Sequence, residues 1–330
     1  MLFVTNRRLL DGRRSEEGRA VTFDPADGEP GVSVYFCERT APGSYTEVLS
    51  APFLDRLRRG PARQVLLFAH GFNCQPEASI FPAALRLQAL CDGLCPGLLE
   101  VVPLVWPCDN DPGLALDYFD DQRAADASGL AYARVLGKFL AWRDRAPPEE
   151  ACLKHVNILA HSMGNRVLRG ALSAWAHDYG CVPALFRTIF MVAPDVANDC
   201  LGPGGGGEAV ADSARNLVVY HAGDDLALRS SKVANVRHKI VRRRLGHTGP
   251  AEPERCARNV VSVDCDAFNG RYDRLGHSYF LAAPDGRPGA VLRHMVETMR
   301  TGRVAGAAHG GRQLLLTDEL GPTPPEPRAA

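Results

Sequence analysis

The sequence places a serine at a sharp turn between an apolar run and a helical pattern. Residues Val156–Ala160 form the run, the turn reads A-H-S-M-G over residues 160–164, and apolar residues then recur at helical spacing. Such a strand, turn and helix unit lifts the serine Oγ clear of the sheet and points helix N–H groups at a developing oxyanion. Alanine replaces the first glycine of the usual G-x-S-x-G pattern. The motif favours a nucleophilic role for Ser162 over a chance match between a core strand and a core helix.

A histidine and an aspartate that would activate this serine follow it in the sequence. A hydroxyl is a weak nucleophile until a base takes its proton, and the base needs a carboxylate to orient it. His277 follows the last predicted strand, and Asp225 follows the second predicted strand after the serine. Ser162, Asp225 and His277 thus occur in the chain order of one large group of serine hydrolases. The sequence predicts that they form a catalytic triad.

The acid and the base of this triad each have alternatives. Asp224 lies in the same predicted loop as Asp225, so position alone does not separate the two. Asp195 ends the preceding strand and is a third option, with capping of the next segment as its other role. For the base, His247 precedes the last predicted strand, which is the wrong position, so His277 is favoured.

A second motif would supply a hydrogen-bond donor to the oxyanion. The buried run Val65–Ala69 ends in H-G-F-N, residues 70–73. An H-G loop at this point, ahead of the serine turn, typically provides one backbone N–H, with the other from the residue after the nucleophile. The expected donors are the N–H groups of Phe72 and Met163, with Asn73 as the alternative to Phe72. The other reading is an ordinary glycine between a strand and a loop.

These residues need a scaffold, and the apolar pattern predicts one. Strands are expected at residues 65–69, 99–106, 156–160, 188–193, 216–220 and 259–263, and helices at 83–90, 117–145, 167–175 and 291–299. Alternation of strand and helix predicts an α/β fold with a mostly parallel central sheet and helices on both faces. Residues 2–4 and 32–37 would add an antiparallel N-terminal edge, with a surface loop over residues 11–31 between them.

The same pattern explains why distant residues should meet. His70, Ser162, Asp195, Asp225 and His277 all lie just past apolar runs or in the loop that follows. Loops that follow parallel strands gather at one edge of the sheet, where sites form. We therefore expect one site at this edge. His70 is assigned to the oxyanion loop and His161 to local packing, so neither is expected to be the base.

Composition excludes several classes of protein. The chain has 330 residues, of which 45% are hydrophobic, and its 38 Lys and Arg balance 38 Asp and Glu. A net charge of zero favours neither nucleic acid nor a membrane surface as a partner. No stretch approaches 18 consecutive apolar residues, so no membrane span is expected. We expect one domain over residues 1–300 and a disordered Gly, Ala and Pro-rich tail over residues 301–330.

Cysteine usage predicts the compartment and argues against a metal site. Ten cysteines are scattered without a C-x-x-C pair, and the N-terminus puts its apolar residues before its arginines, unlike a secretory signal. Reduced thiols in a cytoplasmic protein are the expected reading. Cys91 and Cys95 share a helix face but lack further ligands, and Asp117, Asp120 and Asp121 fit a solvated helix start better than a cation site. No metal and no cofactor are expected.

Two segments have no predicted role in the chemistry. The stretch 229–244 is rich in Arg and Lys and is read as a solvated helix face, with an anionic substrate or partner as the alternative. The glycine run at residues 204–207 is read as a flexible connection.

Several short motifs taken together resemble a known family. They are V-T-N-R near the start, A-H-G-F-N, a strand ending in W-P, A-H-S-M-G-N-R-V-L, A-P-D-V-A-N-D, D-D-L-A-L-R and G-H-S-Y-F. In combination they resemble a bacterial α/β-hydrolase family of unknown function, grouped with the serine esterase/lipase superfamily, over most of residues 1–285. The resemblance implies the α/β-hydrolase fold, Ser162 as nucleophile and His277 as base. The family's acid in D-x-A-L maps to Asp225, which is why Asp225 is preferred to Asp224. The run at residues 204–207 departs from the family pattern.

The expected function follows from these residues. A serine hydrolase that cleaves a small-molecule carboxylic ester through an acyl-enzyme fits them best. An acyltransferase or a thioesterase would use the same triad, and a non-catalytic interaction module on a hydrolase fold is the alternative from a different class. Phe72, Phe81, Trp106 and Tyr279 are candidates for the lining of an apolar acyl pocket, with ordinary core packing as the other reading. The family does not settle a substrate, and oligomeric state stays open.

Overall fold

The computed structural model describes residues 1–12, 14–108, 114–147, 149, 151–229, 243–307 and 311–318, with the backbone alone for residues 114–117. Most of the basic stretch 229–244 and residues 319–330 of the expected tail lie outside these ranges. The strands are β1 (Leu2–Arg7), β2 (Ala20–Val21), β3 (Pro30–Ala41), β4 (Ser44–Glu47), β5 (Gln64–Ala69), β6 (Leu99–Val105), β7 (His155–His161), β8 (Phe186–Val192), β9 (Ala214–His221), β10 (Val260–Asp264) and β11 (Gln313–Leu315). The helices are α1 (Ser50–Arg59), η1 (Pro76–Ile80), α2 (Phe81–Leu94), α3 (Leu114–Arg145), α4 (Gly164–Tyr179), α5 (Glu208–Asp212), α7 (Leu245–Thr248), η3 (Pro253–Arg255), α8 (Asn269–Tyr272) and α9 (Ala290–Thr301).

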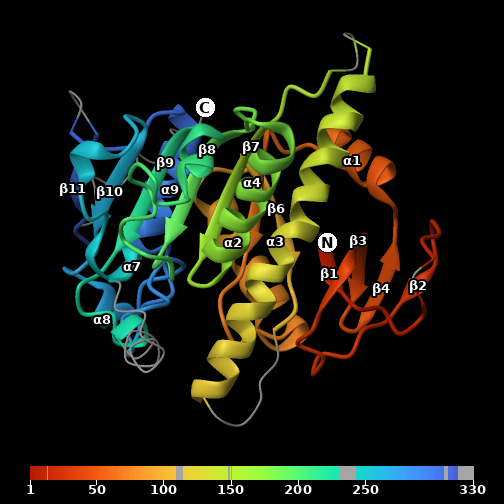
Figure 1. Cartoon of the computed structure of the whole chain (residues 1–330), viewed down its shortest axis with the longest axis horizontal. Coiled ribbons are helices and arrows are strands. Elements are labelled where there is room, and N and C mark those ends of the chain that lie inside the picture. Colours follow the sequence, from red (N-terminus) through yellow and green to blue (C-terminus); the bar gives the residue numbers. More distant parts are fainter. Residues whose placement is uncertain are drawn as a thin grey trace, which may run out of the picture.

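The strands of the described residues form one sheet. Its order is β11-β10-β9-β8-β7-β5-β6-β1-β3-β4-β2. Every pairing from β11 to β1 is parallel, and β1–β3, β3–β4 and β4–β2 are antiparallel. The predicted mostly parallel sheet with an antiparallel N-terminal edge is thus confirmed. In Figure 1, α3 runs along the boundary between the red antiparallel strands and the parallel strands in green and blue.

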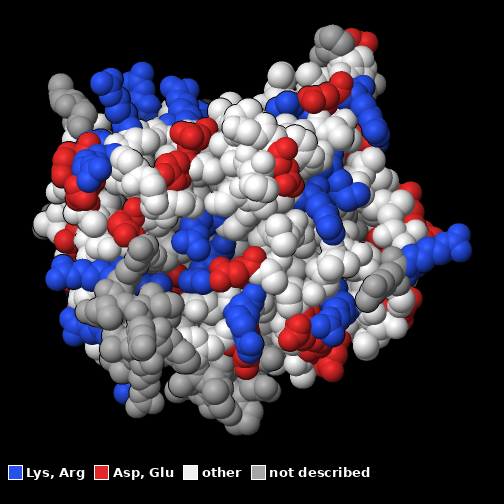
Figure 2. All heavy atoms as spheres, viewed as in Figure 1, with Lys and Arg blue, Asp and Glu red and all other residues white. Residues whose placement is uncertain are grey.

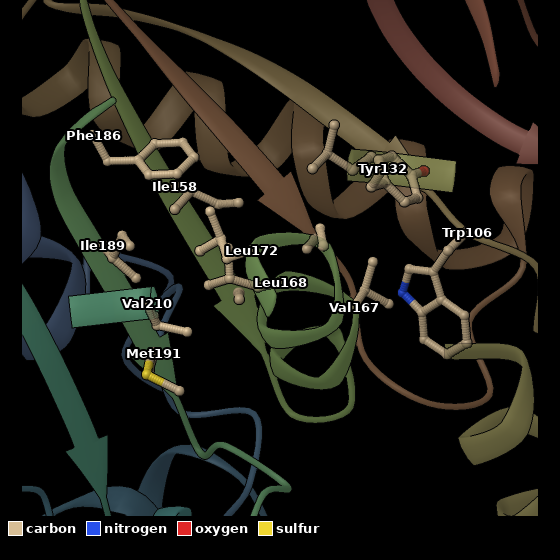
Figure 3. Close-up of a cluster of buried hydrophobic side chains, with 14 of the residues drawn as sticks. Trp106, Tyr132, Ile158, Val167, Leu168, Leu172, Phe186, Ile189, Met191 and Val210 are labelled. Atoms are coloured by element: carbon tan, nitrogen blue, oxygen red, sulfur yellow. The ribbon is translucent and has the colours of Figure 1, made fainter. Parts of the chain in front are cut away.

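Alternate residues of each central strand supply the cores on the two faces of the sheet. In β7, Ile158 and Ala160 pack on the side of α1, α3, α4 and α5, whereas Leu159 packs on the side of α2 and α9. This is the period of two that a strand imposes, with both faces covered. Figure 3 shows the first face, where Ile158 of β7 and Ile189 of β8 lie against Leu168 and Leu172 of α4. Helices on both faces, as predicted, follow from these apolar faces.

The antiparallel edge has a small core of its own. Phe3, Tyr45 and Phe81 contact one another, and Phe23 stacks on Tyr45 with ring centroids 4.8 Å apart. Val21 of β2 is buried in the same cluster. The prediction of a loop throughout residues 11–31 is therefore wrong at β2 and at the start of β3. A two-residue strand is too short to give a sequence period, and the pairing with β4 alone defines it.

The far edge of the sheet also differs from expectation. The strand at residues 260–264 was expected to be the last one, but β11 pairs with it in parallel at residues 313–315. Part of the tail that composition predicts to be disordered is therefore ordered. Its three residues carry too little apolar surface to form a strand alone, and the open edge of β10 supplies their hydrogen-bond partners.

The glycine run is a compact turn and not an open connection. A Cβ at Gly205 would lie 2.2 Å from the carbonyl oxygen of Asp199, and one at Gly207 would lie 2.6 Å from that of Cys200. The backbone N–H of Gly205 donates to the Gly202 carbonyl at 3.0 Å. These glycines permit close backbone approach just before α5.

Charged side chains of both signs are interspersed over the face shown in Figure 2. None of the helices in the described ranges combines the length and the apolarity needed to cross a membrane.

The turn between β7 and α4 depends on a glycine, which gives a first prediction. A Cβ at Gly164 would lie 2.5 Å from the carbonyl oxygens of Ala69 and His70, which are backbone atoms that cannot rotate away. Gly164→Ala should therefore lower the free energy of unfolding by about 1–3 kcal/mol, the usual range for overpacking. Gly93→Ala is the matched control, because Gly93 lies in α2 and a methyl group there would have no atom within 4 Å. Gly93→Ala should raise the free energy of unfolding, measured in urea, by about 0.5–1 kcal/mol. Equal effects at the two sites would contradict the close packing.

Candidate active site

Ser162 lies in a backbone conformation that few residues other than glycine adopt. It follows β7 directly, and its φ is 51°. Its N–H donates to the Val192 carbonyl at 2.9 Å, which ties the turn to the end of β8. A strained non-glycine residue held by its surroundings is typical of functional turns. The predicted strand, turn and helix unit is present, with α4 starting at Gly164.

A residue that sequence reasoning missed holds this turn together. The buried amide Nδ2 of Asn165 donates to the carbonyls of Ala160 at 2.9 Å and of Ser162 at 3.0 Å. It thus bridges the two sides of the turn from the first helical turn of α4. The position of the asparagine three residues after the serine was the available signal, because a short amide side chain there can reach back to the turn carbonyls.

The predicted base and acid are in contact. His277 Nδ1 lies 2.6 Å from Asp225 Oδ2, and the backbone N–H of Leu228 donates to Asp225 Oδ1 at 2.9 Å. The Asp225 side chain is 0% exposed, against 13% for His277. An ionised carboxylate accepts only, so Nδ1 carries the proton and donates it, and this tautomer leaves Nε2 free to accept. The pair therefore has the geometry of an oriented general base.

Neighbouring acids have other roles. Asp224 accepts a hydrogen bond from the amide Nδ2 of Asn269. Asp273, which sequence reasoning missed, accepts the backbone N–H groups of His277 at 2.9 Å and Ser278 at 3.0 Å. Its carboxylate thus fixes the loop that carries the histidine. The structure favours Asp225 over Asp224 as the partner of His277.

The third candidate acid lies in a different network. Asp195 follows β8 and is buried, with the Tyr118 hydroxyl donating to its Oδ2 at 2.5 Å and Arg244 Nε 3.0 Å from its Oδ1. Arg244 is itself buried, so the expectation of a solvated face is wrong at this end of the basic stretch. Burial of a guanidinium requires an opposite charge, and only the fold brings one to it. His247, the alternative base, accepts a hydrogen bond from Arg229 Nε at 3.3 Å.

The Asp195–Arg244 pair gives a second prediction. Removing one member of a buried ion pair leaves an uncompensated buried charge and costs about 3–5 kcal/mol. Arg244→Met should therefore lower the free energy of unfolding by about 3 kcal/mol, measured by urea denaturation. Arg243→Met, at the exposed neighbouring position, is the control and should change it by less than about 0.5 kcal/mol. A small loss for Arg244→Met would show that the pair does not carry a buried charge.

The loop after β5 lies against the serine turn. A Cβ at Gly71 would be 3.1 Å from Ser162 Cβ and 3.0 Å from His161 Nδ1, so only glycine fits without displacement. The N–H of Asn73 donates to Asp121 Oδ2 at 3.0 Å. Among the described residues, the N–H groups of Phe72 and Met163 have no acceptor. This favours Phe72 over Asn73 as the partner of Met163 in an oxyanion hole.

Asp121 is a correction to the sequence analysis. It was expected on a solvated helix face with Asp117 and Asp120, but it is buried and orders the loop after β5 through Asn73. The side chain of Asp117 lies outside what the structure describes. Nothing in the sequence distinguishes the three aspartates, since the face that turns inward depends on how α3 packs.

Two buried histidines flank the site and are neutral. His70 stacks on Trp106 with ring centroids 4.8 Å apart, and its Nε2 lies 3.1 Å from the Trp106 carbonyl. His161 lies 4.9 Å from His277 and 4.8 Å from Phe280, centroid to centroid. Burial lowers the pKa of each histidine to about 3. Both assignments of the sequence analysis, to the oxyanion loop and to local packing, agree with these contacts.

These pKa shifts predict how stability depends on pH. The ordinary histidine pKa is 6.5, so between pH 6.5 and about 3 the unfolded chain binds protons at His70 and His161 that the native chain does not. Stability is then full above pH 6.5 and falls on acidification, by about 1 kcal/mol per pH unit for each histidine. Urea midpoints measured between about pH 7 and pH 4.5 should show at least this slope, because burial also lowers the pKa of His221 and His294, and His161→Gln should remove the share of one histidine. An unchanged slope in the variant would contradict a neutral buried His161.

His161 connects the serine turn to the loop that carries His277. Its Nε2 lies 3.4 Å from the carbonyl oxygen of His277, and it precedes Ser162 directly. Within the described ranges the Ser162 hydroxyl has no hydrogen-bond partner. Catalytic hydrogen bonds are often long in the free enzyme and tighten in the substrate complex. The structure thus brings the serine turn, the His277–Asp225 pair and the loop after β5 to the carboxyl edge of the sheet.

The candidates for metal ligation and for an acyl pocket can also be placed. In the described part of the chain no group of three or more His, Cys, Asp and Glu side chains could hold a metal ion. Trp106, Phe81 and Tyr279 are fully buried core residues, and Phe72 is half-buried against Tyr118.

Comparison with known proteins identifies the family of the chain. Residues 47–293 match the model of the family described as "Alpha/beta hydrolase of unknown function (DUF900)". A search of the curated proteins gives no match. The family match spans three quarters of the chain, from β4 to α9, and includes the serine turn, Asp225 and His277. The chain therefore belongs to this family of alpha/beta hydrolases.

Proposed function

We propose that the protein is a serine hydrolase that cleaves a carboxylic ester of a small molecule through an acyl-enzyme. Ser162 Oγ attacks the acyl carbon while His277 Nε2 takes its proton. The N–H groups of Phe72 and Met163 stabilise the tetrahedral oxyanion. Collapse of the intermediate breaks the ester C–O bond, and His277 returns the proton to the leaving alcohol. Water, deprotonated by His277, then attacks the acyl-enzyme and releases the acid.

The observation that carries this proposal is the 2.6 Å contact between His277 Nδ1 and the fully buried Asp225 carboxylate. A buried carboxylate that accepts from the histidine and from one backbone N–H orients the ring and stabilises its protonated form during catalysis. Ser162, held at φ 51° beside the same histidine loop, supplies the nucleophile. An interaction module without activity would have no need of a strained serine and a buried Asp–His pair together.

Acyl transfer and thioester hydrolysis use the same residues and differ only in the acceptor or leaving group. We keep the ester as the proposed bond, with a small acyl ester as the substrate. The cytoplasm is the proposed compartment, which the free state of all ten cysteines supports.

Labelling with a fluorophosphonate probe tests the proposal. The probe reacts only with an activated serine, so peptide mapping should find the adduct on Ser162. The His277→Ala variant should take no label, because the hydroxyl then lacks its base. Unlabelled wild type would next be screened against p-nitrophenyl esters and thioesters of increasing chain length. A folded wild-type protein that takes no label would contradict the proposal.

A further inference from the structure

A second candidate binding site lies away from the triad, between the sheet and the helices of one face. It is a cavity of about 110 Å³ enclosed by β5, β7, α1, α3 and α4. Its walls are apolar and include Leu67, Ile158, Leu136, Phe139 and Trp142. Engineered apolar cavities of about 150 Å³ stay dry and bind benzene, so this space accepts a short stretch of hydrocarbon chain.

The cavity is separate from the candidate active site. Ser162, Asp225 and His277 are not part of its lining. Figure 3 shows Ile158, Leu168 and Phe186, all of which line it, on the surface between the sheet and α4.

The cavity adjoins a basic groove at the amino end of the sheet. Arg58, Cys152 and Lys154 line both spaces. The groove has a volume of about 570 Å³ and is formed where β5, β7 and β8 begin and α9 ends. Strands of six or seven residues at about 3.3 Å each place it roughly 20 Å from the carboxyl edge that holds Ser162.

The groove has an excess of positive charge. Its cationic side chains are Arg58, Arg63, Lys154, Arg187 and Arg300, with His155 beside them, and no Asp or Glu is among the described residues that line it. Two of these cations form ion pairs with acids that do not line the groove, Arg58 with Asp55 at 3.3 Å and Arg300 with Glu297 at 2.8 Å.

The other cations of the groove form no close ion pair of this kind, although the charge of Lys154 acts on Glu100, outside the lining, and partly offsets the rise that burial causes in the pKa of that carboxyl. For Arg63, Arg187 and Lys154 no ion pair exists within the described part of the chain. The Nε of Arg187 is buried without a hydrogen-bond partner, and Lys154 Nζ donates to the carbonyls of Leu57 and Gly60. The positive charges of Arg187 and Arg215, after burial, also lower the pKa of His155. An anion would therefore be attracted to the groove.

We propose that the cavity and the groove together bind an amphiphile with an unbranched hydrocarbon chain and an anionic headgroup. The end of the chain would enter the cavity past Cys152 and Lys154, and the headgroup would lie among Arg63, Arg187 and Lys154. An apolar space beside a groove whose lining holds cations and no acid among its described residues matches this chemistry, because each part of the ligand finds the environment that it needs. A carboxylate and a phosphate monoester share this headgroup chemistry. The site is independent of the proposed ester hydrolysis.

Titration calorimetry with single-chain amphiphiles, below their micelle concentrations, tests this inference. The series would be sodium hexanoate, octanoate, decanoate and dodecanoate, with decyl phosphate as the second headgroup. Affinity should rise about three- to fourfold for each methylene buried in the cavity and then level off once the cavity is filled. Decyltrimethylammonium should bind at least tenfold more weakly than decanoate. The tighter of decanoate and decyl phosphate identifies the preferred headgroup.

Variants distinguish binding at this site from binding at the triad and from nonspecific adsorption of a surfactant. Cys152→Trp should block the passage between groove and cavity and remove the dependence on chain length. Arg63→Glu should weaken decanoate binding at least tenfold, whereas Arg86→Glu, the same change at an exposed position of α2, should not. Ser162→Ala should bind decanoate as the wild type does, which distinguishes this site from a product site at the triad. Thermal melts confirm that each variant is folded.

Three results would overturn the inference. They are no binding of any anionic amphiphile, equal binding of decyltrimethylammonium and decanoate, and unchanged binding in folded Cys152→Trp.

Discussion

Ser162→Ala should lower ester turnover by about 10⁴- to 10⁶-fold, the largest effect expected of any single substitution in this chain. Without Oγ no acyl-enzyme forms, and only the oxyanion hole and binding remain to accelerate attack by water. The loss should appear in kcat and kcat/KM alike, because the missing interaction is made in the transition state. Steady-state hydrolysis of a p-nitrophenyl ester measures it, with mass spectrometry to show that the acyl adduct is absent.

Ser278→Ala is the matched control, because Ser278 is exposed and lies next to His277 in the same loop. It should leave turnover within about twofold of wild type. Both variants should retain the fold, since alanine keeps the backbone strain of Ser162 and removes only the hydroxyl. The free energy of unfolding of Ser162→Gly should exceed that of Ser162→Ala by about 1 kcal/mol, because glycine adopts φ 51° without a steric penalty. Turnover that survives in folded Ser162→Ala would move the nucleophile elsewhere and refute the triad.

Asp225→Asn should lower kcat by about 10⁴-fold while leaving the geometry of the site in place. The amide can donate to His277 Nδ1, which favours the tautomer that carries its proton on Nε2, and that tautomer cannot accept the serine proton. The buried carboxylate would also no longer stabilise the imidazolium. Burst kinetics should show slow acylation, and the fluorophosphonate label on Ser162 should form at least about 10³-fold more slowly.

The two neighbouring acids are the controls that decide the assignment. Asp224→Asn removes the charge from a side chain that contacts Asn269 and can keep that hydrogen bond through its amide oxygen, so it should change kcat by less than about fivefold. Asp195→Asn acts through the Arg244 and Tyr118 network, so its main effect should be on the free energy of unfolding. If Asp224→Asn were the variant that lost activity, the 2.6 Å contact of Asp225 with His277 would not be the one used in catalysis.

Much of this protein follows from local sequence. Continuous apolar runs such as Val65–Ala69 in β5 and Ile189–Val192 in β8 are buried on both faces and are therefore recognisable as parallel strands. The A-H-S-M-G turn is recognisable because its chemistry requires a small residue, a nucleophile and a glycine at fixed, closely spaced positions. The order of Ser162, Asp225 and His277 along the chain needs no coordinates to be noticed.

Other features could not be predicted from the sequence, because each depends on partners that are distant along the chain. The strands β2 and β11 exist because neighbouring strands offer them hydrogen bonds. Asp121 and Asp120 are alike in sequence, and only the packing of α3 turns one of them inward to Asn73.

What the sequence by itself determined, then, is the alternation of strands and helices and the residue types that can act as nucleophile, acid and base. Apolar periodicity and turn chemistry depend on residues that are close in sequence, so both can be recognised without coordinates. Only the tertiary structure put the Asp225 carboxylate in contact with His277, placed Arg244 on Asp195, and set an apolar cavity beside a basic groove at the opposite edge. These are questions of distance between side chains that lie tens of residues apart, and such distances are set by how helices pack on the sheet.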